Sequence, residues 1–149
     1  IQKEREAKIA ESNRLLKNKE EADKAAADIW GNYKKKLDEQ RDLFIHELSR
    51  FINSDQVERV KNEMTGHELQ KEYSKFMALL PGMTDAQKKK VYDYLLQARK
   101  NAMNVLTSKD RHQWFAKYRG RANNYLAAQG YDLRKATEEF EKKASNNIK

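Results

Sequence analysis

The feature that most constrains this chain is the scarcity of helix-breaking residues in its first fifty positions, where Gly31 is the one glycine and proline is absent. Large apolar residues recur there in steps of three, four or seven, which place them on one stripe of a helix. These residues are Ile29, Tyr33, Leu37, Phe44, Leu48 and Phe51. We therefore predict one long helix over residues 2–51, or two helices in line with a bend at Gly31.

Glycine and proline divide the rest of the chain into shorter helices. Pro81-Gly82 predicts a firm stop, and Gly66 and Gly130 predict two others. Between them, Asn53 and Thr84 are each followed three residues later by glutamine, which is the capping-box pattern of a helix start. We predict helices over residues 54–64, 68–80, 84–106, 107–129 and 132–144, followed by a frayed tail.

These elements predict an all-α fold, a helical bundle with a long N-terminal helix and about five further helices and no sheet. At 149 residues the chain fits a single helical domain, residues 1–149. Residues 1–28 are poor in large apolar side chains, so we expect them either to project from the body or to pack on it in part. The chain opens with Ile1 inside a helical pattern, and we expect that an upstream segment is missing.

Composition argues against several classes of protein. The chain lacks cysteine, which excludes disulfides, thiolate metal ligands and cysteine nucleophiles. No run approaches the roughly 18 apolar residues that a membrane span needs. His46, His67 and His112 are scattered, without a second ligand at metal-binding spacing. We therefore expect no catalytic residue, no metal and no cofactor.

The segment over residues 107–135 has the most chemical character, because seven Lys/Arg and two Asp are interleaved there with aromatic residues. Guanidinium and amide groups suit carboxylates, phosphates or sugar hydroxyls. The candidate binding residues are Lys117, Arg119, Arg121, Asn123, Asn124, Trp114 and Tyr131. A solvated basic face over an aromatic core is the alternative interpretation. If the residues bind a ligand, replacing Arg119 and Arg121 by alanine should abolish binding and leave the melting temperature nearly unchanged.

The most specific motif in this segment is KYRGRANNYLAAQGYD, residues 117–132, supported by QVERVKNEMT and the opening REAKI. It resembles the signature of an uncharacterised secreted family of Bacteroidetes, a domain of unknown function that is often encoded beside enzymes degrading plant polysaccharides, notably pectin. The resemblance implies a helical, exported protein, periplasmic or extracellular. It implies no established activity and no catalytic residues.

The leading hypothesis for function is a non-catalytic accessory protein of polysaccharide utilisation that binds an acidic glycan or a partner protein. Arg119, Arg121, Lys117, Asn123 and Asn124 would contact carboxylates and hydroxyls, and Trp114 or Tyr131 would offer a ring. One alternative is a helical chaperone or scaffold, because MTDAQ and INSDQ resemble an element of Spy-type periplasmic chaperones. Another is a uronate-processing enzyme.

The distribution of charge along the chain indicates whether a nucleic acid is an expected partner. The net charge of +8 is concentrated in residues 101–149, which carry ten Lys/Arg and five Asp/Glu. The first hundred residues are nearly neutral, so we do not expect a nucleic-acid partner. The oligomeric state does not follow from the sequence.

Overall fold

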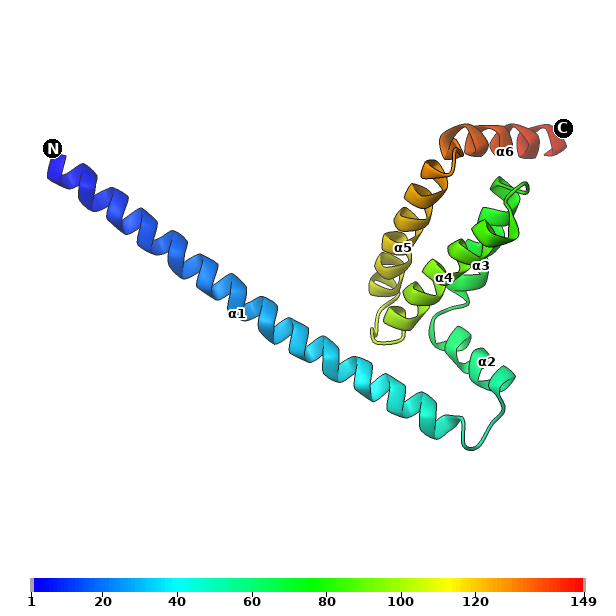
Figure 1. Ribbon diagram of the computed structural model, residues 1–149, viewed down its shortest axis with the longest axis horizontal. Helices are drawn as coiled ribbons and strands as arrows, with labels where there is room; N and C mark the ends of the chain where they lie inside the picture. The colour runs from blue at the N-terminus through cyan, green and yellow to red at the C-terminus, as the bar shows by residue number, and fades with distance from the viewer. Residues whose placement is uncertain (1, 149) are drawn as a thin grey trace. The chain divides into compact units, whose positions relative to one another are not determined.

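Six helices make up most of residues 2–148, which the computed structural model describes (Figure 1). They are α1 (Gln2–Leu48), α2 (Ser54–Met64), α3 (Glu68–Leu79), α4 (Asp85–Ala102), α5 (Ser108–Ala128) and α6 (Leu133–Ile148). No strand occurs among these residues. The predicted all-α fold, with a long first helix and five further helices, is confirmed.

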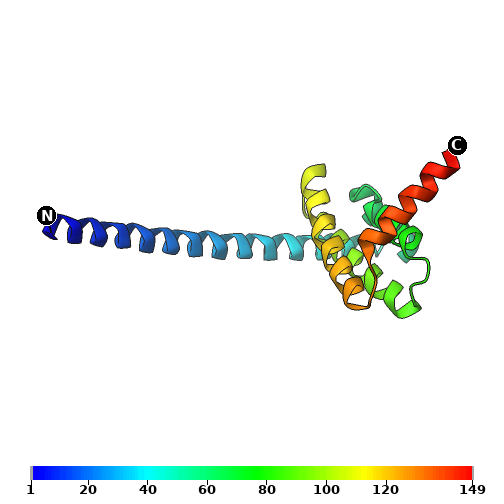
Figure 2. The same ribbon diagram turned by 90° about the horizontal axis from the view of Figure 1, so that it is seen from above.

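The chain divides into two compact units, the first ending at Asp42 and the second beginning at Leu43. The first unit is the part of helix α1 up to Asp42, and α1 continues through Gly31 without interruption (Figure 2). Of the two predicted alternatives, the structure has the single long helix and not two helices that meet at Gly31. A glycine inside a helix costs only about 1 kcal/mol relative to alanine, and good helix formers stand on both sides of it, three alanines at 25–27 and three lysines at 34–36. The large side chains of Ile29, Trp30 and Tyr33 are all exposed.

Side-chain capping boxes set the beginnings of α2 and α4. Asn53 and Gln56 form the predicted capping box, with the Gln56 N–H donating to Asn53 Oδ1 at 2.9 Å and the Asn53 N–H donating to Gln56 Oε1 at 3.0 Å. Thr84 and Gln87 form the second box. Each box satisfies two backbone donors that would otherwise lack a partner. These two predicted helix starts are confirmed.

Three helix ends differ from the prediction. Helix α1 ends at Leu48 rather than at residue 51, because the chain turns there and the N–H of Phe51 donates to Leu48 O at 3.0 Å. Helix α4 stops at Ala102 rather than near residue 106, because the chain turns there: the N–H of Asn104 donates to Asn101 O at 3.1 Å and that of Val105 to Ala102 O at 3.4 Å. Helix α6 continues to Ile148, past the predicted end at residue 144, so the expected frayed tail is helical as far as the structure describes it.

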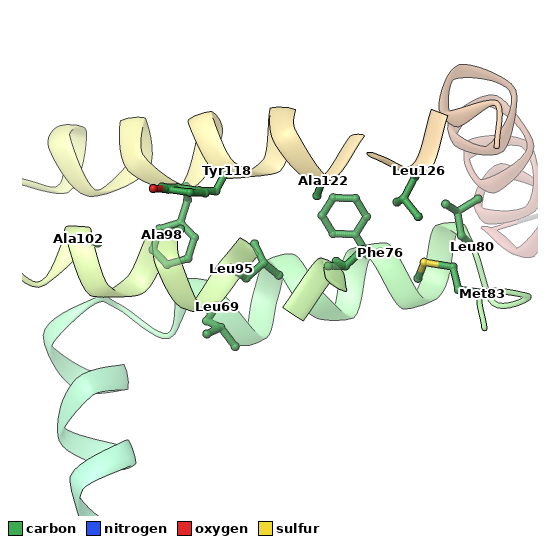
Figure 3. Close-up of a cluster of buried hydrophobic side chains, with 12 residues drawn as sticks. Leu69, Phe76, Leu80, Met83, Leu95, Ala98, Ala102, Tyr118, Ala122 and Leu126 are labelled. Carbon is green, nitrogen blue, oxygen red and sulfur yellow. The ribbon is translucent and has the colours of Figure 1, made fainter. Parts of the chain in front are cut away.

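The core of the second unit lies between α4 and α5, with α3 packed against both (Figure 3). The two helices run antiparallel, since Ala102, Ala98 and Leu95 of α4 follow one another in the same direction as Tyr118, Ala122 and Leu126 of α5 (Figure 3). Tyr94 of α4 lies against Tyr125 of α5, with ring centroids 6.4 Å apart. Alanines at their interface are fully buried and let the backbones approach closely. The side chains of this cluster are Leu69, Phe76, Leu80, Met83, Val91, Leu95, Ala98, Ala102, Phe115, Tyr118, Ala122 and Leu126.

Helix α2 is tied to α4 by a buried arginine. Arg99, 4% exposed, donates to Glu58 Oε2 at 2.7 Å and to Asn62 Oδ1 at 2.9 Å. Burial alone would raise the pKa of Glu58, but its hydrogen bond to Arg99 and the charges of Arg99 and Lys61 outweigh burial and hold that pKa below its ordinary value.

Replacing Glu58 by glutamine is expected to remove a contribution to stability that depends on pH. A carboxyl whose pKa is lowered in the folded state stabilises the fold above its unfolded pKa, about 4.3, and this contribution is lost as the pH falls through the folded value. Urea unfolding should therefore show Glu58→Gln less stable than wild type at pH 7, with the difference shrinking towards pH 3. Glu139→Gln, on exposed α6, is the control, and a difference that is constant with pH would contradict the assignment.

Replacing Ala122 by leucine tests the close approach of α4 and α5. Ala122 has no exposed surface, so extra methylenes there are expected to lower the free energy of unfolding by about 1–3 kcal/mol. Ala116, exposed on the same helix, is the matched control, and Ala116→Leu should change stability by less than about 0.5 kcal/mol. Equal effects in urea unfolding would mean that the interface has room to spare.

Candidate functional site

A groove in the second unit lies between α3, α5 and α6. Its volume is about 220 Å³. Five polar or charged residues and three apolar ones line it: Glu72, Lys75, Phe76, Leu79, Arg119, Asn123, Leu133 and Thr137. A cavity of this size holds a small ligand or one unit of a longer one.

The charged end of the groove is built on a buried carboxylate. Glu72, 2% exposed, lies on the inner side of α3 and accepts a hydrogen bond from Arg119 Nη1 of α5 at 2.8 Å. Lys75 Nζ is 3.8 Å from the same Glu72 oxygen and is itself exposed. A guanidinium carries five N–H donors, so this bond orients Arg119 and leaves further donors for a ligand.

Amide and hydroxyl groups lie farther along the same groove. Asn123 follows Arg119 by one helical turn, which places both on one flank of α5. The hydroxyl of Thr137 donates to the carbonyl oxygen of Leu133 at 2.8 Å, so its oxygen is left as an acceptor. Phe76 and Leu79 supply an apolar wall. The groove therefore combines cations, neutral hydrogen-bonding groups and an apolar surface.

The seven predicted binding residues are divided by the structure. Of these, Arg119 and Asn123 line the groove. The others on α5 lie elsewhere because successive helical residues are turned by about 100°. Lys117 Nζ lies 5.1 Å above the Trp114 ring, the Arg121 guanidinium lies 4.8 Å above the Tyr118 ring, and Asn124 is exposed.

Tyr131 has a structural contact of its own. Its hydroxyl donates to Gln87 Oε1 at 2.7 Å, and Gln87 Nε2 donates in turn to Gln129 Oε1 at 3.3 Å. Gln87 is also the third residue of the α4 capping box. Tyr131 thus joins the turn between α5 and α6 to the start of α4, and it does not line the groove.

Sequence analysis missed the part of the site that α3 and α6 supply: Glu72, Lys75 and Thr137. One signal was available for Glu72. It stands between Leu69 and Phe76 at helical spacing, so a carboxylate occupies the apolar stripe of α3 and needs a cationic partner. The partner could not be identified without knowing how α3 meets α5.

Neither a metal-binding cluster nor a membrane-spanning helix occurs in the described part of the chain. Within residues 2–148 no three His, Cys, Asp or Glu side chains gather in a way that could hold a metal ion. Among the same residues, no helix combines the length and apolarity required to cross a membrane.

Comparison with known proteins adds a family but no activity. The model of a family described as protein of unknown function (DUF3826) matches residues 1–146. No curated protein matches the chain. This match confirms the resemblance to an uncharacterised family that the sequence showed.

The ion pair between Glu72 and Arg119 changes the effect on stability that we expect from replacing Arg119. Arg119→Ala would leave a buried carboxylate facing only Lys75 at 3.8 Å. We expect it to lower the free energy of unfolding by about 3 kcal/mol, the low end for breaking a buried pair, since Arg119 itself is half exposed. Urea unfolding measures this.

Arg121→Ala is the control, because it loses only an exposed cation–ring contact and should cost less than about 1 kcal/mol. The expectation that both arginines can be removed without lowering the melting temperature is thereby revised. Equal stabilities of the two variants would show that the ion pair with Glu72 contributes little.

Proposed function

The chain belongs to the DUF3826 family of proteins of unknown function, and on this premise we propose that it is a non-catalytic binding protein whose groove holds a carboxylate-bearing sugar of an acidic polysaccharide. The observation that carries the proposal is the Arg119 guanidinium, held at the groove by a buried carboxylate 2.8 Å away. A planar cation fixed in this way is suited to a carboxylate ligand.

The charges of the groove favour a ligand with a single negative charge. Arg119 and Lys75 are cationic and Glu72 is anionic, so the lining has one positive charge in excess. Asn123 and Thr137 offer an amide and a hydroxyl oxygen for sugar hydroxyls, while Phe76 and Leu79 suit the C–H face of a sugar ring. A sugar acid presents all three kinds of group.

The same lining supports a binding role rather than catalysis. Glu72 is the one carboxylate among the residues that line the groove, and it is buried in an ion pair with Arg119. Acid–base cleavage of a glycan needs groups that can give and take a proton within reach of the scissile bond. Release of unsaturated or reducing-end products from polygalacturonate by the purified protein would overturn this part of the proposal.

The setting proposed for this protein is the periplasm or the cell surface, beside enzymes of plant-polysaccharide degradation. It rests on the resemblance of residues 117–132 to a secreted family of Bacteroidetes. Fractionation of the native host, with detection by antibody, checks it: recovery in the cytoplasmic fraction alone would contradict it.

A helical scaffold or chaperone is the second candidate, favoured by one observation. Ile29, Trp30 and Tyr33 of α1 are 68%, 69% and 52% exposed, which is unusual for neighbouring large apolar side chains. If they bind unfolded clients, substoichiometric protein should suppress client aggregation, and a variant with all three replaced by serine should not.

Replacing Asn123 by leucine is expected to weaken binding of digalacturonate about five- to tenfold, because one hydrogen bond contributes about 1 kcal/mol. Asn124→Leu is the matched control, since Asn124 is adjacent in sequence but does not line the groove. Isothermal titration calorimetry at physiological salt measures both affinities. Absence of binding by wild type, or equal losses in both variants, would contradict the proposal.

A further inference from the structure

A row of aromatic rings follows the junction of α4 and α5, away from the groove. Trp114, Tyr118, Arg121 and Tyr125 are spaced by four, three and four residues, which places them on one face of α5. The rings of Trp114 and Tyr118 are stacked at 6.4 Å and 23°, and Tyr125 meets Tyr94 of α4. We call this row, together with Lys90 of α4, the cation–aromatic strip.

Cations lie over the rings of the strip. The Arg121 guanidinium is 4.8 Å from the centre of the Tyr118 ring, and Lys90 Nζ is 5.0 Å from that of Tyr94. Lys117 Nζ lies over Trp114. None of these three cations pairs with a carboxylate in the part of the chain that the structure describes. A ring attracts a cation without neutralising it, so their charge remains available to a ligand.

Few acidic side chains oppose these cations. No Asp or Glu occurs between Arg111 and Tyr131, a segment that holds most of α5. Helix α4 has an excess of three positive charges and α5 an excess of four, which together account for most of the net charge of +8. An anionic partner therefore meets attraction along both helices, with little repulsion.

We propose that the cation–aromatic strip is a second binding surface, which takes an extended chain of an acidic polysaccharide. It rests on the proposed function for the class of ligand, but its side chains are different from those of the groove. The α5 part of the strip rises about 16 Å over the eleven residue steps from Trp114 to Tyr125, long enough for more than one sugar unit. The half-buried rings of Trp114 and Tyr125 suit the C–H and hydroxyl groups of sugars, whereas the buried Tyr118 holds Arg121 in place.

The spacing of charge favours a polysaccharide over a nucleic acid. Lys117 and Arg121 are four residues apart on α5, which is about 6 Å along the helix, whereas a DNA strand carries one phosphate per about 3.4 Å and the duplex one per about 1.7 Å. A polymer with one carboxylate per sugar is sparser in charge. The spacing of cations on the strip is closer to the spacing of carboxylates in such a polymer than to the spacing of phosphates in DNA.

The test compares two double variants that remove the same number of charges. Lys90→Gln with Arg121→Gln alters the strip, while Lys142→Gln with Lys143→Gln alters exposed cations of α6 that line neither surface. The probes are polygalacturonate, its methyl-esterified form and digalacturonate, at physiological salt. The strip variant should bind polygalacturonate about tenfold more weakly than wild type, and the α6 variant within twofold of it. Esterified polymer should bind weakly to all three proteins.

Digalacturonate separates this proposal from the proposed function. With two sugar units it can occupy the groove but cannot extend along the strip as well. The strip variant should therefore bind digalacturonate as tightly as wild type does. If wild type fails to bind digalacturonate but its polymer binding depends on the strip, the groove proposal fails and the strip proposal stands. Equal polymer affinities in the two double variants would overturn the strip, as would tighter binding of wild type to single-stranded oligothymidylate than to polygalacturonate. Melting temperatures of both variants within a few degrees of wild type show that folding is intact.

Discussion

The close contact between α4 and α5 is the interaction on which the rest of the second unit depends. Ala98, Ala102 and Ala122 are buried completely at this contact, and their small side chains allow the two backbones to approach closely. Because the contact determines how α5 is turned about its axis, it also determines which side chains each flank of α5 presents. Both proposed binding surfaces follow from that single orientation.

The buried carboxylate of Glu72 links the stability of this unit to its candidate site. A carboxylate that is 2% exposed needs a partner, and Arg119 supplies one from α5. The same bond restricts the guanidinium to an orientation from which its remaining donors reach the groove. Arg119 therefore belongs to the fold and to the site together, which is why a substitution there has to be interpreted through both stability and binding.

Helix α5 presents the two proposed binding surfaces on different flanks. On one flank, Arg119 and Asn123 line the groove that we propose for a single sugar acid. On the other, the exposed Arg121 lies over the buried ring of Tyr118, in the strip that we propose for a longer chain. The absence of carboxylates between Arg111 and Tyr131 serves both flanks, since an acidic residue on either would oppose an anionic ligand. A binding protein of this kind would hold a polymer at two places without cleaving it.

The sequence by itself determined the helical class and the two capping boxes, because these depend on residues within a few positions of one another. It left open whether one helix runs through Gly31 or two helices meet there with a bend, since the propensities of many neighbours together decide this. Only the tertiary structure decided which of the seven predicted residues share a surface. Arg119 and Asn123 meet Lys75 and Thr137 from other helices, whereas Arg121, two residues from Arg119, lies on the opposite flank. Such contacts depend on the packing angle and rotation of whole helices, which no local pattern of residues specifies.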